Sequence, residues 1–333
     1  MQETPMTNFT IITANDIHIS DHPPRNRMDD YQESILNKLT QMGTICSKLG
    51  ADAAAIAGDL FNIKEPAKNS HDLNRALVEV FQKFPCPIYM IEGNHDMTGN
   101  RLESIKEQPL GVLFADKTLI QLREAVLEKN GLKMSLVGVP YIPELDLNKL
   151  VLPSKEGFVS QVCLMHLYAG VKAGKLFSER MYGYDELAKL SPDIFVIGHY
   201  HIDQGIYENE GKYFVNIGSM SRGTLSEEDI GHSPQVGCIK IQVDEHGNPE
   251  YKLKAIKLSV RPASEIFDIA KKQEEQKENK AIQEFVEKLA TQAVGNAISS
   301  KESIETIIDK MDMAKTVKDK VTHYLQQAAV TNT

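Results

Sequence analysis

Apolar runs that each end in an acid, an amide or a histidine constrain this chain most. Residues 88–91 (Ile-Tyr-Met-Ile) are followed at once by Glu92-Gly93-Asn94-His95-Asp96. A short apolar run bounded by a glycine is typical of a buried strand that feeds a tight loop. The loop then places an amide, an imidazole and a carboxylate at the carboxyl end of a sheet. Open α/β folds bind their ligands at that edge.

The same arrangement recurs along the chain. Residues 9–14 lead into Asp16 and His18, 53–57 into Asp59, 162–165 into His166, and 194–197 into His199 and His201. In the first half these runs alternate with helical apolar spacing over 31–49 and 70–84, a βαβαβ order that favours parallel pairing. The second half is mostly strands, with a hairpin predicted around 245–248. We therefore expect an α/β fold (an α+β sandwich) of two packed sheets flanked by helices.

The character of the sequence changes near Pro262. Residues 264–333 show no convincing strand, and residues 271–280 are almost entirely charged or amide-bearing. Apolar residues then return at helical spacing, which predicts a few short amphipathic helices. We expect a core domain over 1–262 and a small helical C-terminal region over 263–333. That region either docks on a partner helix or packs on its own domain.

Composition narrows the cellular context. No apolar run approaches the roughly 20 residues that span a bilayer, so we expect no membrane segment. The N-terminus has no basic residue, and the four cysteines lie far apart, which predicts reduced thiols and a cytoplasmic protein. A net charge of −9 argues against a freestanding nucleic-acid-binding module. It argues much less against a phosphoesterase, because bound cations would dominate the local field.

The residues after the strands have the chemistry of a metal site. Carboxylate, imidazole and amide groups without a thiolate suit manganese, iron, zinc or magnesium. Asp59 lies in the sequence between the pair Asp16/His18 and the pair His199/His201, and could bridge two ions through its two oxygens. Two ions ~3.5–4 Å apart suit phosphoester hydrolysis. The predicted ligands are Asp16, His18, Asp59, Asn94, His166, His199 and His201.

Two further residues are assigned catalytic roles. His95 sits beside a ligand and is placed to contact the phosphate and protonate the leaving oxygen. Asp96 either fixes the His95 tautomer or holds the loop. Each motif alone is weak, but five of them at successive strand exits are specific as a set.

The ordered motifs DIH, GDLF, GNHD, H and GHYH resemble those of the calcineurin-like metallophosphoesterases, over roughly residues 8–220. The resemblance implies a two-sheet sandwich with a dinuclear centre, often manganese. By position, it implies that His95 is the catalytic imidazole. It also implies a first ion held by Asp16, His18, Asp59 and His201, and a second held by Asp59, Asn94, His166 and His199.

Within that family, the chain looks most like the SbcD-type nucleases of DNA double-strand-break repair. The similarity rests on residues 58–61, the long helix before them, residues 216–219 and residues 260–262. It implies a DNA exonuclease and endonuclease that acts in repair and recombination, an SbcC-type coiled-coil ATPase as partner, and a homodimer. Ile19-Ser20 replaces a common Leu-Gly, and the short C-terminal part puts a full DNA-capping domain in doubt.

Other interpretations stay open. The acidic charge favours a phosphoesterase of the same fold that acts on a cyclic nucleotide or a phosphoprotein. A non-catalytic scaffold is a third option, against which the complete ligand set argues. Residues 170–175 resemble a phosphate loop, but their spacing is wrong, so we expect a flexible loop there and no ATP site. The histidines outside the motifs are expected at the surface: His22, His71, His232, His246 and His323.

Overall fold

A computed structural model describes residues 7–24, 27–176, 179–223, 226, 230–271 and 277. The chain divides into two compact units, residues 1–267 and 268–333. Helix α6 (Ala263–Ile266) belongs to the first unit, which therefore continues past Pro262. The helices predicted beyond residue 277 lie outside the described residues.

The first of two large sheets carries the βαβαβ order predicted from the sequence. Within the described residues it has six strands, and β1, β2 and β3 pair in parallel, as expected. Strand β14 pairs antiparallel with β1, and the predicted hairpin joins β14 to β15, which pairs antiparallel with it. In spatial order the strands are β15 (Pro249–Lys257), β14 (Gln235–Val243), β1 (Thr7–Ala14), β2 (Ala53–Ala57), β3 (Ile88–Ile91) and β4 (Ile120–Gln121).

The second large sheet also has six strands in the described part of the chain. Its centre is parallel, with β11 between β7 and β13, and its two edges are antiparallel. In spatial order the strands are β12 (Gly205–Asn209), β13 (Lys212–Asn216), β11 (Ile194–Gly198), β7 (Ser160–His166), β6 (Leu132–Val139) and β5 (Glu124–Lys129).

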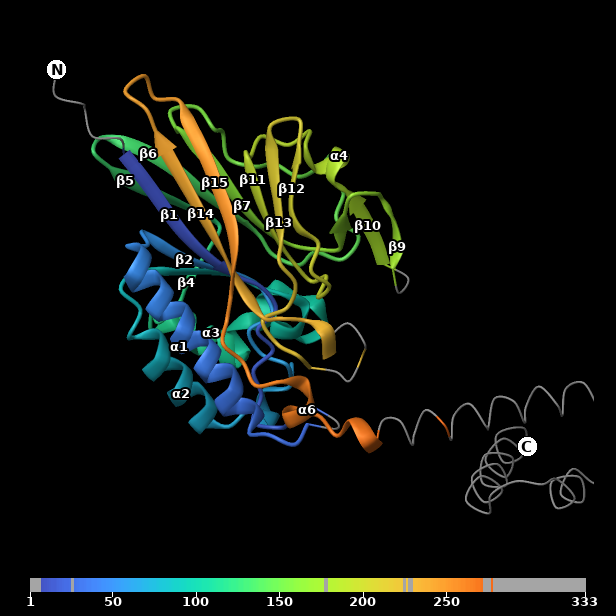
Figure 1. Cartoon of the computed structure of the whole chain (residues 1–333). Helices are drawn as coiled ribbons and strands as arrows, with labels where there is room; N and C mark the ends of the chain where they lie inside the picture. The colour runs from blue at the N-terminus through green and yellow to red at the C-terminus, as the bar shows by residue number, and fades with distance from the viewer. Residues whose placement is uncertain are drawn as a thin grey trace, which may run out of the picture. The chain divides into compact units, whose positions relative to one another are not determined.

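The two sheets pack face to face, which confirms the predicted α/β sandwich (Figure 1). Ile11 and Ala55 of the first sheet and Leu164 and Val196 of the second are fully buried in the shared core. Alanines fill four of the five positions of β2, and their small side chains let β2 contact β7 and β11 of the other sheet. The two sheets therefore approach each other closely where β2 ends.

Helices cover the outer faces. Helix α1 (Tyr31–Leu49) packs beside α2 (His71–Phe81) over the first sheet (Figure 1). The Asp30 carboxylate caps α1 by accepting from Glu33 N at 2.9 Å, and Gly50 ends the helix with φ of 58°. Further helical elements in the described part of the chain include α3 (Pro109–Ala115), α4 (Tyr184–Leu187) and 3₁₀ turns at Pro66–Lys68, Asn94–Asp96, Thr98–Asn100 and Leu102–Glu107.

A small third sheet corrects one expectation. The predicted flexible loop over 170–175 instead contributes to β8 (Ala169–Gly170) and β9 (Gly174–Leu176), which pair with β10 (Glu179–Gly183). Short strands rich in glycine give little periodicity, so the sequence pattern did not indicate them. This sheet adjoins the end of β7.

The expectations on membrane segments and on the cysteines can be compared with the structure. Among the described residues, no helix is both long enough and apolar enough to cross a bilayer. Cys46, Cys163 and Cys238 are buried free thiols, and Cys86 is a partly buried one.

Candidate metal centre

All seven predicted ligands lie at or just after the carboxyl ends of parallel strands. Asp16 and His18 follow β1, Asp59 follows β2 and Asn94 follows β3. In the second sheet, His166 is the last residue of β7, and His199 and His201 follow β11. Because the sheets face each other, these exits meet at one edge of the sandwich.

The backbone at four of these positions is unusual. Asp16 and His18 have φ of 49°, Asp59 has φ of 54° and His199 has φ of 85°. Side chains other than glycine seldom adopt this left-handed region, and such residues cluster at functional sites. All four positions lie just after the end of a strand.

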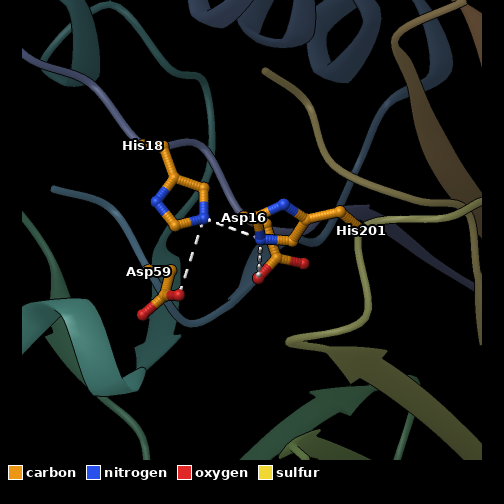
Figure 2. A group of neighbouring side chains, drawn as sticks. All are labelled: Asp16, His18, Asp59 and His201. Atoms are coloured by element: carbon orange, nitrogen blue, oxygen red, sulfur yellow. Dashed lines mark hydrogen bonds and ion pairs between the residues drawn. The ribbon is translucent and has the colours of Figure 1, made fainter. Parts of the chain in front are cut away.

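The first group of donors is Asp16, His18, Asp59 and His201, whose ligand atoms lie within 4.8 Å of one another. Figure 2 shows the His18 ring between Asp59 and His201. Its Nε2 lies 3.5 Å from Asp59 Oδ2 and 3.0 Å from His201 Nε2. His201 Nε2 also lies 3.9 Å from Asp16 Oδ1. The donors point inward from three strand exits.

The second group is Asp59, His166 and His199, again within 4.8 Å, with Asn94 beside them. His166 Nε2 lies 3.4 Å from Asp59 Oδ2 and 3.3 Å from Asn94 Oδ1. The His166 Nδ1–H donates to the carbonyl of Ala57 at 2.7 Å across the sheet interface. This bond fixes the tautomer, so the Nε2 lone pair of the neutral ring is directed at the other donors.

Asp59 belongs to both groups. Its Oδ1 accepts from His95 N at 2.8 Å, whereas its buried Oδ2 has no hydrogen-bond partner among the described residues. Burial raises the pKa of Asp59, but the His166 and His18 imidazoles outweigh it and hold the pKa well below its usual range. A buried carboxylate oxygen without a partner is costly in a folded protein. An oxygen aimed between two sets of nitrogen and oxygen donors fits a bridging ligand of two cations.

The glycines before the ligands leave room for them. A Cβ on Gly93 would lie 2.0 Å from Asp59 Oδ1 and 2.5 Å from Asp59 N. A Cβ on Gly58, whose φ is 89°, would lie 2.3 Å from His166 Nδ1. The bridging carboxylate and the His166 ring therefore occupy the space that larger residues would fill.

His95 and Asp96 have different surroundings. The His95 Nδ1–H donates to Asn62 O at 2.8 Å, and the residue lines the cleft beside the donors. Asp96 is buried and accepts from four backbone N–H groups at 2.9–3.2 Å, those of Asp59, Leu60, Phe61 and Gly93. Of the two roles considered for Asp96, these bonds match holding the loop. Asn62, rather than Asp96, fixes the His95 tautomer.

The segment after β13 supports the first group from behind. The Ser219 hydroxyl donates to Asp16 O at 2.7 Å, and Met220 N donates to Asn15 O at 2.9 Å. A Cβ on Gly218, at φ of 73°, would lie 2.7 Å from His201 O. Residues 216–219, which carry part of the sequence resemblance, therefore shape the loops that hold Asp16 and His201.

A cleft of about 740 Å³ opens over the donors. Its lining includes five residues of the predicted site, Asp59, Asn94, His95, His199 and His201, together with Asp203, His232, Gln235 and Lys257. His232 was expected at the surface but is half-buried and lines this cleft, whereas His22, His71 and His246 are exposed as expected. His323 lies outside the described residues.

Two cleft residues that contact His199, Tyr168 and Glu179, were not predicted from the sequence. The Tyr168 ring lies 4.0 Å from the His199 ring between centroids, and Glu179 Oε2 lies 3.2 Å from His199 Nε2. Neither belongs to a strand-exit motif, because Glu179 begins a strand of the small sheet. The only signal was closeness in sequence to His166, which does not distinguish them from surface residues.

Solved structures of similar fold include three phosphoesterases or phosphatases. YfkN from Bacillus subtilis, a calcineurin-like phosphoesterase, is 12% identical, with 78% of this chain and 94% of that chain covered and a TM-score of 0.45. A dimetal phosphatase from Danio rerio is 13% identical, with 75% and 99% covered and a TM-score of 0.43. A phosphatase from Mycoplasma pneumoniae is 13% identical, with 78% and 96% covered and a TM-score of 0.42.

The family comparison is more decisive. The sequence model of the calcineurin-like phosphoesterases matches residues 9–203, which is more than half of the chain and contains all seven ligand positions. Phosphoester hydrolysis at a divalent-metal site is the chemistry that this match and the buried Asp/His cluster indicate together. The chain belongs to the calcineurin-like phosphoesterase family.

Proposed function

We propose that the chain is a divalent-metal-dependent phosphodiesterase that hydrolyses DNA, the nuclease subunit of an SbcCD-like repair complex. The observation that carries the proposal is the position of Asp59. One unpartnered carboxylate oxygen lies 3.4 Å from His166 Nε2 and 3.5 Å from His18 Nε2, beside an open cleft. The sequence resemblance in residues 58–61 and 216–219 supports DNA as the substrate.

The first group would hold one ion and the second group, with Asn94, the other. Manganese is the proposed metal, and magnesium, iron or zinc also suit these donors. When bound, two such ions lower the pKa of water and neutralise charge on the phosphoryl oxygens.

His95 would act on the leaving group. The Asn62 carbonyl accepts from Nδ1–H whether the ring is neutral or protonated, so the ring keeps one orientation in both states. Nε2 can then give its proton to the leaving oxygen without a ring flip. Asp96 would act indirectly, because its four backbone bonds hold the loops that carry Asp59 and His95.

The substrate assay compares three phosphoesters with manganese present: end-labelled linear duplex DNA, a cyclic nucleotide and a phosphopeptide. We expect cleavage of DNA, and a loss of roughly 10²–10⁴-fold in His95→Gln with ion binding unchanged. Turnover of the cyclic nucleotide or phosphopeptide without DNA cleavage would instead support the second substrate class. Failure to bind two ions per chain would support the scaffold.

The partners are part of the proposal. We expect the chain to bind an SbcC-type coiled-coil ATPase, to form a homodimer and to work in the cytoplasm. Co-purification with an ATPase encoded beside its gene, followed by the same DNA assay with ATP, tests this. If the ATPase neither binds the chain nor changes its DNA cleavage, the SbcCD-like complex is ruled out. The chain would then remain a phosphodiesterase that acts without this partner.

A further inference from the structure

Glu179, which lies in neither donor group, contacts one of the donors directly. It begins β10 of the small sheet, and its Oε2 lies 3.2 Å from Nε2 of His199. The same oxygen lies 3.3 Å from the hydroxyl of Tyr141, which follows β6 of the second large sheet. One carboxylate oxygen therefore joins the His199 ring to a tyrosine from a separate segment.

We infer that Glu179 is a positioning residue that sets the tautomer and orientation of His199. The ring Nε2–H donates to the carboxylate, which leaves the Nδ1 lone pair for the ion of the second group. Ligand imidazoles commonly donate their other N–H to a carboxylate or carbonyl, and this raises their basicity and fixes their orientation. The inference rests on the two-ion site of the proposed function, but not on DNA as its substrate.

The surroundings of His199 leave its ring few alternatives. The residue is 7% exposed, and its backbone N donates to Asp16 Oδ1 at 2.9 Å. The Tyr168 ring lies against one side, with centroids 4.0 Å apart, and the Tyr141 ring lies at 5.2 Å. With the backbone held and the ring enclosed, the hydrogen-bond partner at Nε2 decides which nitrogen keeps the proton.

Tyr141 in turn holds Glu179. The Glu179 side chain is 44% exposed, so by itself it would sample several rotamers. The Tyr141 hydroxyl donates to Glu179 Oε2 at 3.3 Å, the same oxygen that faces His199. The tyrosine therefore selects the Glu179 rotamer that reaches His199.

His166 provides an internal comparison. Its Nδ1–H donates to the Ala57 carbonyl at 2.7 Å, a main-chain acceptor in the core. Both imidazoles of the second group therefore have an acceptor behind them. The acceptor behind His166 is a backbone carbonyl, whereas the acceptor behind His199 is the Glu179 side chain, which a substitution can remove.

The first experiment determines the tautomer in the metal-free protein. Two-dimensional ¹H–¹⁵N spectra of the full chain with ¹⁵N-labelled histidine distinguish Nε2–H from Nδ1–H rings. We expect His199 to be the Nε2–H tautomer in the parent and in Glu179→Gln, because the amide oxygen also accepts. Glu179→Ala should give a mixture of tautomers. An unchanged His199 signal in Glu179→Ala would overturn the inference.

The second experiment measures manganese affinity by calorimetry. We expect Glu179→Ala to lower the affinity for one of the two manganese ions by roughly 10–100-fold. The affinities of Glu179→Gln should stay close to those of the parent. Glu156→Ala, which removes an exposed glutamate from a loop, serves as the matched control and should change nothing. If Glu179→Gln weakens binding as much as Glu179→Ala, the carboxylate acts through its charge or as a ligand, and the inference is wrong.

Two further measurements distinguish positioning of His199 from a general loss of stability. The thermal midpoint of metal-free Glu179→Ala should equal that of the parent, because a merely structural role would lower it. If that variant does not fold, Tyr141→Phe removes the rotamer anchor instead, and we expect a smaller loss for the same ion. Unchanged affinity in Tyr141→Phe would then contradict the inference. None of these results depends on DNA cleavage, so they separate this inference from the proposed substrate.

Discussion

The two donor groups share Asp59 but are held in place by different means. In the first group, Asp16 and His18 are aimed by left-handed backbone turns, and the His201 side chain is 46% exposed at the cleft. In the second group, His166 is 1% exposed, and the ring nitrogen turned away from the other donors is bonded to Ala57 O. His199 of the second group also has a left-handed backbone, with φ of 85°. What distinguishes the second group is therefore the added hydrogen bonds behind its rings.

This difference has a consequence for substitution. A change in the loop backbone should damage the first group most, because three of its four side chains, Asp16, His18 and Asp59, start from a left-handed backbone. A change behind an imidazole should damage one ion of the second group and spare the other. Only a change at Asp59, or in the space that it occupies, should affect both.

The largest effect is expected for Asp59→Asn. The amide cannot offer a negative oxygen to both groups, so both ions should bind at least about a hundredfold more weakly and phosphoester cleavage should be lost. Manganese stoichiometry and phosphodiester hydrolysis measure this, with circular dichroism as the check on folding. Asp52→Asn, in the residue just before the same strand, is the matched control and should retain activity. Full manganese-dependent activity in Asp59→Asn would rule out the shared bridge.

Gly93→Ala should disturb both groups without changing any donor. Its Cβ would lie 2.0 Å from Asp59 Oδ1, so the carboxylate or the loop must move. We expect a loss of about 1–3 kcal/mol in the free energy of unfolding, typical of an overpacked site, together with weaker binding of both ions. Urea denaturation and calorimetry measure the two effects. Gly174→Ala, where a Cβ meets nothing within 4 Å, should be neutral.

Single imidazole substitutions should separate the groups. We expect His166→Asn to weaken the ion of the second group, and His201→Asn the ion of the first, each by roughly 10–100-fold. Titration of each variant with manganese, followed by electron paramagnetic resonance, distinguishes one bound ion from a coupled pair. If either variant lost both ions together, the two groups would form one cooperative site and the comparison would fail.

The smallest effect is expected for a change of one pH unit, which should act on the second group. Burial lowers the pKa of His166, but the Asp59 carboxylate outweighs it and raises the pKa to about 9. Below that pH an incoming ion must displace a proton, so the affinity should rise about tenfold per pH unit up to about pH 9 and then level off. Burial and the neighbouring His166 lower the pKa of His199 to about 3, so His199 adds no proton at neutral pH. Calorimetry in buffers of different ionisation enthalpy counts the protons released. Release of no proton at pH 7–8 would contradict the assigned state of His166.

Much of the fold could be predicted from local patterns. The helix at 31–49 has its apolar residues on one face, a capping aspartate and a terminal glycine, and the structure confirms both ends. The predicted helix over 70–84 ends earlier, at Phe81, because the chain turns before Pro85 while Phe84 still packs against the core. The predicted hairpin around 245–248 is confirmed as the turn between β14 and β15. Edge strands such as β5 and β12 were missed, because their half-exposed residues lack a continuous apolar run.

The candidate site was likewise predictable from the sequence only in part. The sequence by itself determined which side chains gather at the sheet edge, because an acid, amide or imidazole at the end of a buried parallel strand emerges there. It could not determine what stands behind them. Asn62 behind His95, Ala57 behind His166 and Glu179 behind His199 come from other segments. Only tertiary packing, between loops of the first sheet, between the two large sheets and against the small sheet, brings these acceptors within hydrogen-bond distance. Such contacts join residues far apart in the chain and follow no local period.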